Sequence, residues 1–228
     1  MLNLTRLWTG QSQPADPLRY GRGGSAPASA RTRRPIVVWN ITRTCNLRCV
    51  HCYSDSEAVA YPGELSWPRM AALVGELADY GVPGLLLSGG EPMVHPRFDD
   101  LLRMACGLGL KVTISTNGTC ITAANAARFK ELGGAYVGIS LDGIGAIHDQ
   151  FRGKPGAFDA AVRGFRHCHA VGQKTGLRLT LTRHNAENLE AILDFIEAED
   201  IRRACFYHLV PAGRGSGLQV LDAAMSRQ

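Results

Sequence analysis

The sequence predicts an α/β fold in which six strand–helix units form an open, partial (βα) barrel. Short runs of β-branched and aliphatic residues alternate along the chain with longer segments whose apolar residues recur at helical spacing. Such an alternation requires a parallel sheet joined by right-handed crossovers. Six units suit an open barrel better than a closed one of eight units. Polar motifs directly after several strands agree with a site at the carboxyl edge of the sheet.

The expected strands are six short apolar runs. They span residues 36–39, 85–87, 112–114, 136–139, 177–181 and 204–209. Apolar residues at helical spacing predict helices through residues 70–77, 98–105, 122–132, 157–171 and 189–196. Ser66 is expected to cap the first helix, with Pro68 in its first turn, and Asn185 to cap the last.

The chain is expected to divide into an arm, a barrel and a tail. Residues 1–34 include Gly21–Pro27, a glycine-rich stretch with few core-forming residues, and this segment is predicted to be a flexible N-terminal arm. Residues 35–215 contain all six units. Residues 213–217 have the composition of a loop, and residues 216–228 are too few for a domain and are expected to form a tail.

The composition is that of an ordinary globular protein. The 228 residues are 45% hydrophobic and 20% charged. No apolar run approaches the ~20 residues needed to cross a bilayer, and the N-terminus lacks the apolar segment of a secretory signal, so we expect a cytoplasmic protein outside the membrane. The formal net charge of +5 permits an acidic substrate, but without a lysine-rich tract it does not indicate nucleic-acid binding.

Three of the seven cysteines, Cys45, Cys49 and Cys52, follow the first strand with the spacing CxxxCxxC. In a reducing compartment this pattern does not indicate disulfides. Three thiolates in a short loop can bind three irons of a [4Fe–4S] cluster and leave the fourth iron open to another ligand. The remaining cysteines are expected to be small buried hydrophobes: Cys106, Cys120, Cys168 and Cys205.

A structural zinc site is the alternative for these cysteines. Such a site usually closes four ligands, commonly in two separated pairs. His51 could supply the fourth ligand, but it adjoins Cys52 and would be strained, and no second CxxC follows in the chain. The spacing therefore favours an iron–sulfur cluster.

Three further motifs follow the second, third and fourth strands. Gly89 and Gly90 would let backbone groups approach a ligand closely, and Glu91 can accept a hydrogen bond from an ammonium group. Asn117-Gly118 and Asp142-Gly143 have turn chemistry. Taken alone, each motif could simply close a loop.

Together these motifs resemble the radical S-adenosylmethionine (SAM) superfamily, whose fold is a six-unit partial TIM barrel with CxxxCxxC after the first strand. The resemblance implies that SAM chelates the open iron and that an electron from the cluster cleaves it to methionine and a 5′-deoxyadenosyl radical. Gly89-Gly90-Glu91 corresponds to the motif that holds the SAM amine.

The same resemblance assigns further SAM contacts. Asn117, Ser140 and Asp142 would face the SAM ribose and carboxylate, and Arg152 would pair with the carboxylate, for which a guanidinium is suited. A surface salt bridge is the alternative for Arg152. His51 would lie near the adenine, with packing under the loop as the equal alternative.

Segments at 16–21, 38–43 and 206–215 resemble the NirJ family of heme d1 biosynthesis and the related alternative heme synthesis enzymes. This implies an iron tetrapyrrole substrate, didecarboxysiroheme, from which two propionate side chains are removed to leave carbonyl oxygens. It also implies an electron donor such as a flavodoxin or ferredoxin. Candidate partners for the propionates are Arg43, Arg48 and Arg214.

One departure from the family concerns a second cluster. Members usually carry a cysteine-rich region after the barrel, and no such group follows Cys205 here. We expect a truncated form, a second-cluster module on another chain, or a protein that does not need a second cluster.

Two alternatives to a tetrapyrrole enzyme remain. They are a radical SAM peptide-modifying maturase and a non-catalytic iron–sulfur binding or electron-transfer protein.

Overall fold

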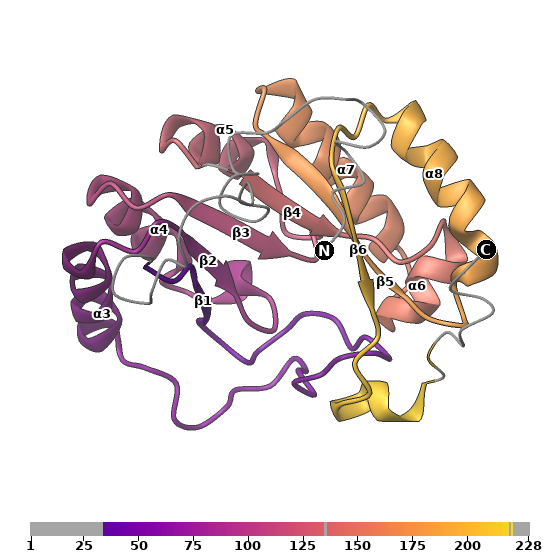
Figure 1. The fold of residues 1–228 in the computed structure, drawn as a ribbon, viewed down its shortest axis with the longest axis horizontal. Helices are drawn as coiled ribbons and strands as arrows, with labels where there is room; N and C mark the ends of the chain where they lie inside the picture. The colour runs from indigo at the N-terminus through magenta and orange to yellow at the C-terminus, as the bar shows by residue number, and fades with distance from the viewer. Residues whose placement is uncertain (1–33, 135, 219, 221–228) are drawn as a thin grey trace, which may run out of the picture.

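The computed structural model describes residues 34–134, 136–218 and 220, which form one parallel sheet with helices between its strands (Figure 1). The expected arm at residues 1–34 lies outside the described residues except for Arg34, and so do residue 219 and residues 221–228 of the expected tail.

The sheet contains all six expected strands, in the order β1-β2-β3-β4-β5-β6. Every neighbouring pair is parallel, so the carboxyl ends of the strands meet at one edge. This arrangement confirms the predicted partial barrel. The strands are β1 (Val37–Asn40), β2 (Leu85–Ser88), β3 (Val112–Thr116), β4 (Tyr136–Ser140), β5 (Thr175–Leu181) and β6 (Ala204–His208).

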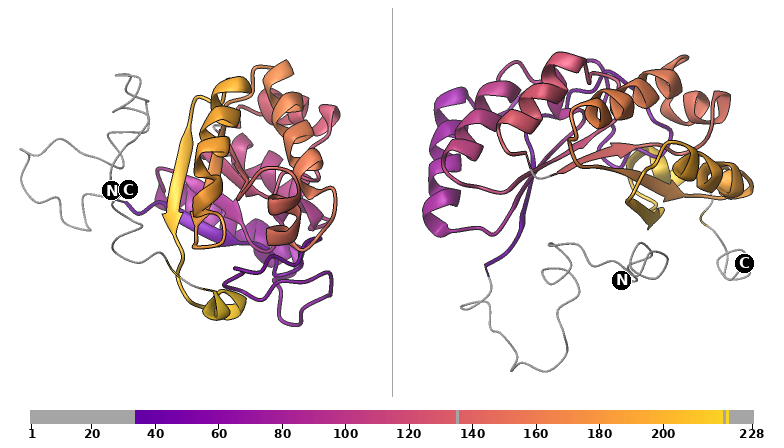
Figure 2. Two further views of the ribbon diagram at one scale, coloured as in Figure 1. Left: turned by 90° about the vertical axis from the view of Figure 1, so that its right-hand side faces the viewer. Right: turned by 90° about the horizontal axis from the view of Figure 1, so that it is seen from above.

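The helices lie together on one side of the sheet (Figure 2). They are α3 (Trp67–Tyr80), α4 (Phe98–Gly107), α5 (Ala123–Glu131), α6 (Ala146–Arg152), α7 (Ala157–Ala170) and α8 (Leu189–Ala198). Three short 3₁₀ helices lie outside these, η1 (Pro92–Val94), η2 (Ala186–Asn188) and η3 (Gly213–Gly217). The sequence did not predict α6. The loop expected at 213–217 is helix η3, which crosses the boundary placed at residue 215.

One of the two expected N-cap positions is confirmed and the other is wrong. Ser66 occupies the N-cap position of α3, but its side chain makes no capping hydrogen bond. Asn185 precedes η2 rather than α8, and its side chain binds elsewhere. By contrast, Thr122 and Asn125 form a reciprocal capping box at the start of α5.

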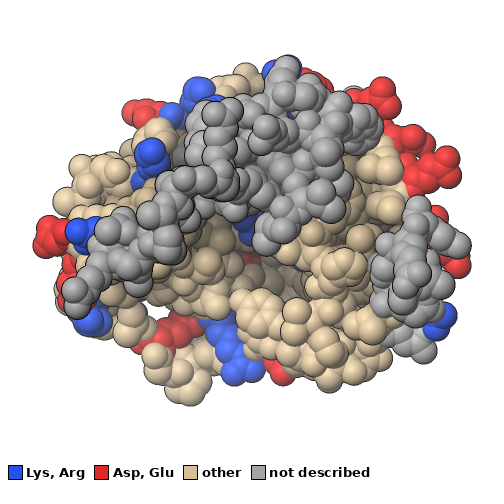
Figure 3. Space-filling view, viewed as in Figure 1, with Lys and Arg blue, Asp and Glu red and all other residues tan. Residues whose placement is uncertain are grey.

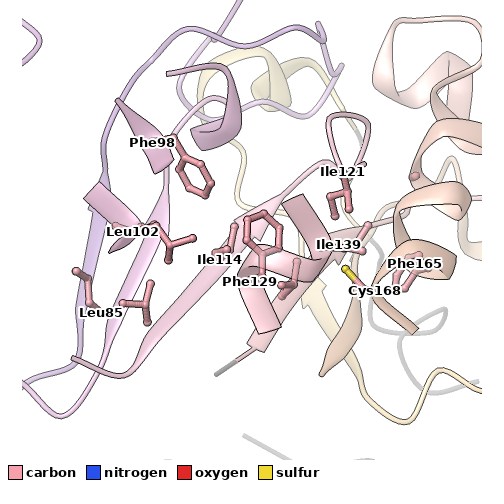
Figure 4. Packing of buried hydrophobic residues seen from close by; sticks show 14 of the residues in the cluster. Leu85, Phe98, Leu102, Ile114, Ile121, Phe129, Ile139, Phe165 and Cys168 are labelled. Carbon is pink, nitrogen blue, oxygen red and sulfur yellow. The ribbon is translucent and has the colours of Figure 1, made fainter. Parts of the chain in front are cut away.

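The hydrophobic core lies between the sheet and the helices (Figure 4). Alternate strand residues such as Leu85, Ile114 and Ile139 are fully or almost fully buried there, as the period of two along a strand requires. The rings of Phe98 and Phe129 meet edge to face at 6.2 Å between centroids.

The four cysteines outside the loop were expected to be small buried hydrophobes, and this is fully confirmed for one of them. Cys168 is buried in the core, whereas Cys106, Cys120 and Cys205 are only partly buried.

Charged side chains of both signs surround the face of the molecule seen in Figure 3, with acidic side chains gathered near α8.

Within the part of the chain that the structure describes, none of the helices combines the length and the apolar character that a membrane span requires.

Candidate functional site

The three clustered cysteines lie in the loop that leaves β1 at the carboxyl edge of the sheet. Cys45 and Cys49 are buried and Cys52 is half-buried. Together with Leu47 and Ala157 they form a small apolar group separate from the main core. The fold thus gathers the three predicted ligands in one small cluster.

Hydrogen-bond donors face each of the three sulfurs. The Leu47 N–H lies 3.4 Å from Cys45 Sγ, and the Ser56 N–H lies 3.4 Å from Cys52 Sγ. Arg152 Nη1 lies 3.6 Å from Cys49 Sγ. Donors of this kind stabilise thiolates and tune a bound cluster.

The protonation of the thiols depends on what they bind. Burial raises the pKa of Cys45 to about 12 and also raises the pKa of Cys49. Burial acts in the same direction on Cys52, but hydrogen bonds from Ser54 and Ser56 outweigh it and lower the pKa of that thiol. Two of the three thiols therefore stay protonated at neutral pH until metal displaces their protons.

The surroundings of the three cysteines agree with a cluster site. Among the described residues, no group of three or more His, Cys, Asp or Glu side chains is placed to hold a metal ion. A zinc site needs its ligands around one ion, whereas each cysteine of a [4Fe–4S] site binds a different iron. Three thiols in one group, each with an N–H donor of its own, agree with the second requirement.

Gly89 and Gly90 bring the end of β2 against the cysteine loop. The Gly90 N–H donates to Thr42 O at 2.8 Å. A Cβ on Gly89 would lie 2.3 Å from Thr42 O, and one on Gly90 would lie 2.4 Å from Thr44 O. The glycines are therefore required by close approach to the loop that carries the cysteines, a reason that the sequence alone did not supply.

Glu91 is fully buried beside the cysteine loop. Its Oε1 accepts from Thr116 Oγ1 at 2.8 Å and from the Met93 N–H at 3.1 Å, and its Oε2 accepts from the Asn117 N–H at 2.7 Å. Burial raises the pKa of Glu91 to about 7 despite these bonds. A fixed, desolvated carboxylate of this kind is suited to an ammonium group.

Asn117 links the end of β3 to the cysteine loop. Its Nδ2 donates to Asn46 Oδ1 at 2.8 Å and lies 3.9 Å from Cys45 Sγ. Its Oδ1 accepts from the Thr119 N–H at 2.9 Å. Ser140 is the half-buried last residue of β4 and lies opposite Arg178 of β5. Both predicted residues therefore lie at the carboxyl edge.

Asp142 and Arg152 form a buried ion pair, through Asp142 Oδ2 and Arg152 Nη2. Asp142 Oδ1 also accepts from the Thr180 N–H at 2.7 Å. Arg152 is thus not on the surface, and the Asp142 carboxylate has partners on both oxygens. Since Arg152 also faces Cys49, the pair connects the cysteine loop to the ends of β4 and β5.

Two residues for which the sequence indicated no contact with Asp142 hold it in place. The Asp142 N–H donates to His148 Nδ1 at 3.1 Å, and Asn185 Nδ2 donates to Asp142 O at 3.0 Å. Burial lowers the pKa of His148 to about 3, so the ring is neutral and can accept. No local sequence pattern indicated these two contacts with Asp142. Thr116 and Asn46, the partners of Glu91 and Asn117, are different, because they adjoin predicted motifs in the sequence.

His51 lies under the loop, with its ring centroid 4.5 Å from that of Phe151. Burial lowers its pKa to about 4, and its Nδ1 is buried without a hydrogen-bond partner among the described residues. A neutral ring with a free nitrogen agrees with either expected role, adenine contact or packing.

The three arginines considered for the propionates each contact the cysteine loop. Arg43 Nε donates to Ser54 O at 2.7 Å, and Arg48 Nε pairs with Glu57 at 3.0 Å. Arg214 Nε donates to Cys49 O at 2.9 Å.

A comparison with known families identifies the class. Residues 39–196 match the model of the radical SAM superfamily, which is more than half of the chain. The chain therefore belongs to the radical SAM superfamily, whose members are enzymes that use a [4Fe–4S] cluster and SAM. The residues described above fit these cofactors.

Two curated relatives narrow the comparison. The chain is 45% identical to the Fe-coproporphyrin III synthase of Methanosarcina barkeri, over 100% of this chain and 59% of the relative. It is 42% identical to the pre-heme d1 synthase of Dinoroseobacter shibae, over 88% of this chain and 50% of the relative. The chain thus spans little more than half the length of these relatives.

A solved structure agrees on the fold. SuiB of Streptococcus suis bound to SAM has a TM-score of 0.72 and 20% sequence identity, covering 83% of this chain and 44% of that chain.

Proposed function

We propose that the chain is the barrel of a radical SAM enzyme of heme d1 biosynthesis that acts on propionate side chains of didecarboxysiroheme. The observation that carries the proposal is the convergence of Cys45, Cys49 and Cys52 with Glu91 and Arg152 at one edge of the sheet. The similarity to two relatives named for tetrapyrrole synthesis supports the substrate class.

In this proposal the three cysteines hold the cluster. When bound, the cluster and SAM supply the 5′-deoxyadenosyl radical, which is strong enough to attack an unactivated C–H bond beside a propionate. The protein excludes water from this chemistry, because Cys45, Cys49 and Glu91 are all buried.

Glu91, Asn117, Ser140 and Arg152 would position SAM. Glu91 would accept from the SAM amine, since it is the buried carboxylate next to the loop. Arg152 would face the SAM carboxylate, and its Nε is buried without a partner among the described residues. Asp142 would act on SAM through Arg152, because its Oδ2 already pairs with that guanidinium.

The setting of the reaction is part of the proposal. All seven cysteines are free thiols in the structure, which suits a reducing, cytoplasmic compartment. We propose that a flavodoxin or ferredoxin supplies the electron there.

The test is turnover of the tetrapyrrole. Anaerobically reconstituted protein with dithionite and SAM is incubated with didecarboxysiroheme, and the products are identified by mass spectrometry. The proposal expects loss of two propionate side chains with new carbonyl oxygens on the ring. No product and no tetrapyrrole binding would contradict it and favour a peptide-modifying maturase.

A second candidate product is iron coproporphyrin III. It is favoured by the 45% identity to the synthase named for that compound, which extends over the whole chain. The same mass spectra separate the two candidates, because iron coproporphyrin III retains four propionates and carries no carbonyl oxygens on the ring.

A further inference from the structure

Two long polar side chains lie flat on the face of the sheet opposite the helices. Along β4, Val137 and Ile139 are buried in the core on the helix side. Because side chains alternate along a strand, Tyr136 and Gly138 belong to the opposite face, which is the concave side of the partial barrel (Figure 2).

Arg178 of β5 crosses β4 at a glycine. Its Nη1 donates to Ser115 Oγ of β3 at 2.7 Å, and it reaches that strand by passing over Gly138. A Cβ on Gly138 would lie 2.4 Å from Arg178 Nε. Any larger residue at position 138 would therefore displace the guanidinium.

Tyr136 lies over a second glycine in the same manner. A Cβ on Gly176 would lie 2.1 Å from the Tyr136 hydroxyl. The Arg203 guanidinium lies over the Tyr136 ring, 5.3 Å from its centroid, and places a second positive charge beside this patch. The glycines of two neighbouring strands thus make room for an arginine and a tyrosine.

The polar atoms of this patch are not satisfied by the protein. The Tyr136 hydroxyl and Arg178 Nε are both buried and have no hydrogen-bond partner among the described residues. A buried donor without a partner is energetically unfavourable, so two of them beside a cation indicate an anionic acceptor.

The patch adjoins the proposed SAM contacts. Ser115 lies on β3, two residues before Asn117, which follows that strand, and Arg178 lies opposite Ser140 in the parallel register. A group bound by Arg178 would therefore lie next to the site where the radical is formed, on the concave side of the sheet.

We propose that Arg178, Ser115 and Tyr136 bind a carboxylate of the substrate. Within the proposed function, on which this rests, that carboxylate is a propionate of the iron tetrapyrrole. A guanidinium, a hydroxyl and a phenol supply only donors to the carboxylate oxygens, which suits a group that accepts on both of them. This site takes the role expected of Arg43, Arg48 and Arg214.

The experiment compares two probes on reconstituted protein. Iron coproporphyrin III carries free propionates, and its tetramethyl ester carries none, and the dissociation constant of each is measured from the Soret absorbance. Arg178→Gln is expected to weaken binding of the acid about 10- to 100-fold, as for a lost hydrogen bond to a charged group, and to leave binding of the ester unchanged. Arg178→Lys should recover part of the loss.

Two further variants complete the design. Gly138→Ala keeps every charge but displaces the guanidinium, so it should weaken acid binding as well. Arg202→Gln is the matched control, because Arg202 is 82% exposed and pairs with Asp200 on the surface. Circular dichroism checks that each variant is folded. If Arg178→Gln does not fold, the acid and ester affinities of Arg178→Lys and Gly138→Ala test the site in its place.

The outcomes are distinguishable. Support requires a wild-type preference for the acid that Arg178→Gln abolishes and Arg202→Gln retains. If the Arg178 and Gly138 variants keep the wild-type preference, or if wild type binds acid and ester equally, the site is wrong while the proposed function stands. If wild type binds neither probe, the tetrapyrrole function and this site fail together.

Discussion

Replacing Asp142 by asparagine would leave the buried Arg152 guanidinium without its counter-charge. Asp142 is fully buried and Arg152 is 6% exposed. The asparagine could still accept from the Thr180 N–H through its oxygen, but its amide nitrogen would then face the guanidinium, donor against donor. The Cys49 sulfur would remain beside Arg152, but burial raises the pKa of that thiol, so without metal it supplies no counter-charge.

Breaking a buried pair by removing one partner costs about 3–5 kcal/mol. For a domain of this size each kcal/mol lowers the unfolding midpoint by about 2–4 °C, so Asp142→Asn should lower it by about 6–20 °C. Thermal unfolding followed by circular dichroism measures the shift. Asp200→Asn is the control, since Asp200 is 75% exposed and its pair with Arg202 contributes little.

Equal midpoints for Asp142→Asn and Asp200→Asn would refute this reasoning. They would mean that the guanidinium finds another partner or reaches water, and that the pair does not organise the site.

Three more predictions concern the cysteine loop and its neighbours. Cys49→Ala should abolish the iron–sulfur absorbance after reconstitution, while Cys106→Ala, which lies outside the loop, should keep it; a retained cluster in the first variant would refute the ligand assignment. Because the pKa of Glu91 is raised to about 7, protonation at lower pH removes the carboxylate that SAM needs, and SAM affinity should fall about tenfold per pH unit below 7. Equilibrium binding across pH 5–8 measures this, and Glu91→Gln should bind weakly with no such dependence; a flat wild-type profile would contradict the assignment. Gly90→Ala should destabilise the protein by about 1–3 kcal/mol and lower its iron content, because the added methyl would lie 2.4 Å from Thr44 O. Gly107→Ala, whose Cβ would meet nothing within 4 Å, should lower neither the unfolding midpoint nor the iron content.

The strands could be predicted because burial on a parallel sheet leaves a simple pattern. Runs such as Leu85–Leu87 are continuous and apolar, and the structure places them in the sheet within one or two residues of the expected ends. Helix α6 escaped prediction because it has only seven residues and contains the polar residues His148, Asp149 and Gln150.

The site could be predicted as a set of positions but not as a set of contacts. Three cysteines close together in sequence must be close in space, and motifs after parallel strands must share an edge. The pairing of Asp142 with Arg152 depends on the path of α6, and the crossing of Arg178 over Gly138 depends on strand register. Neither has a local sequence pattern, because both are set by tertiary packing.

The measurement that tests the central claim most directly is reductive cleavage of SAM. Anaerobically reconstituted protein, reduced with dithionite, should release 5′-deoxyadenosine and methionine, and Cys49→Ala should release neither. Iron and sulfide content should show about four irons per chain. Full cluster loading without any 5′-deoxyadenosine would contradict the account and favour an iron–sulfur protein that only binds or transfers electrons.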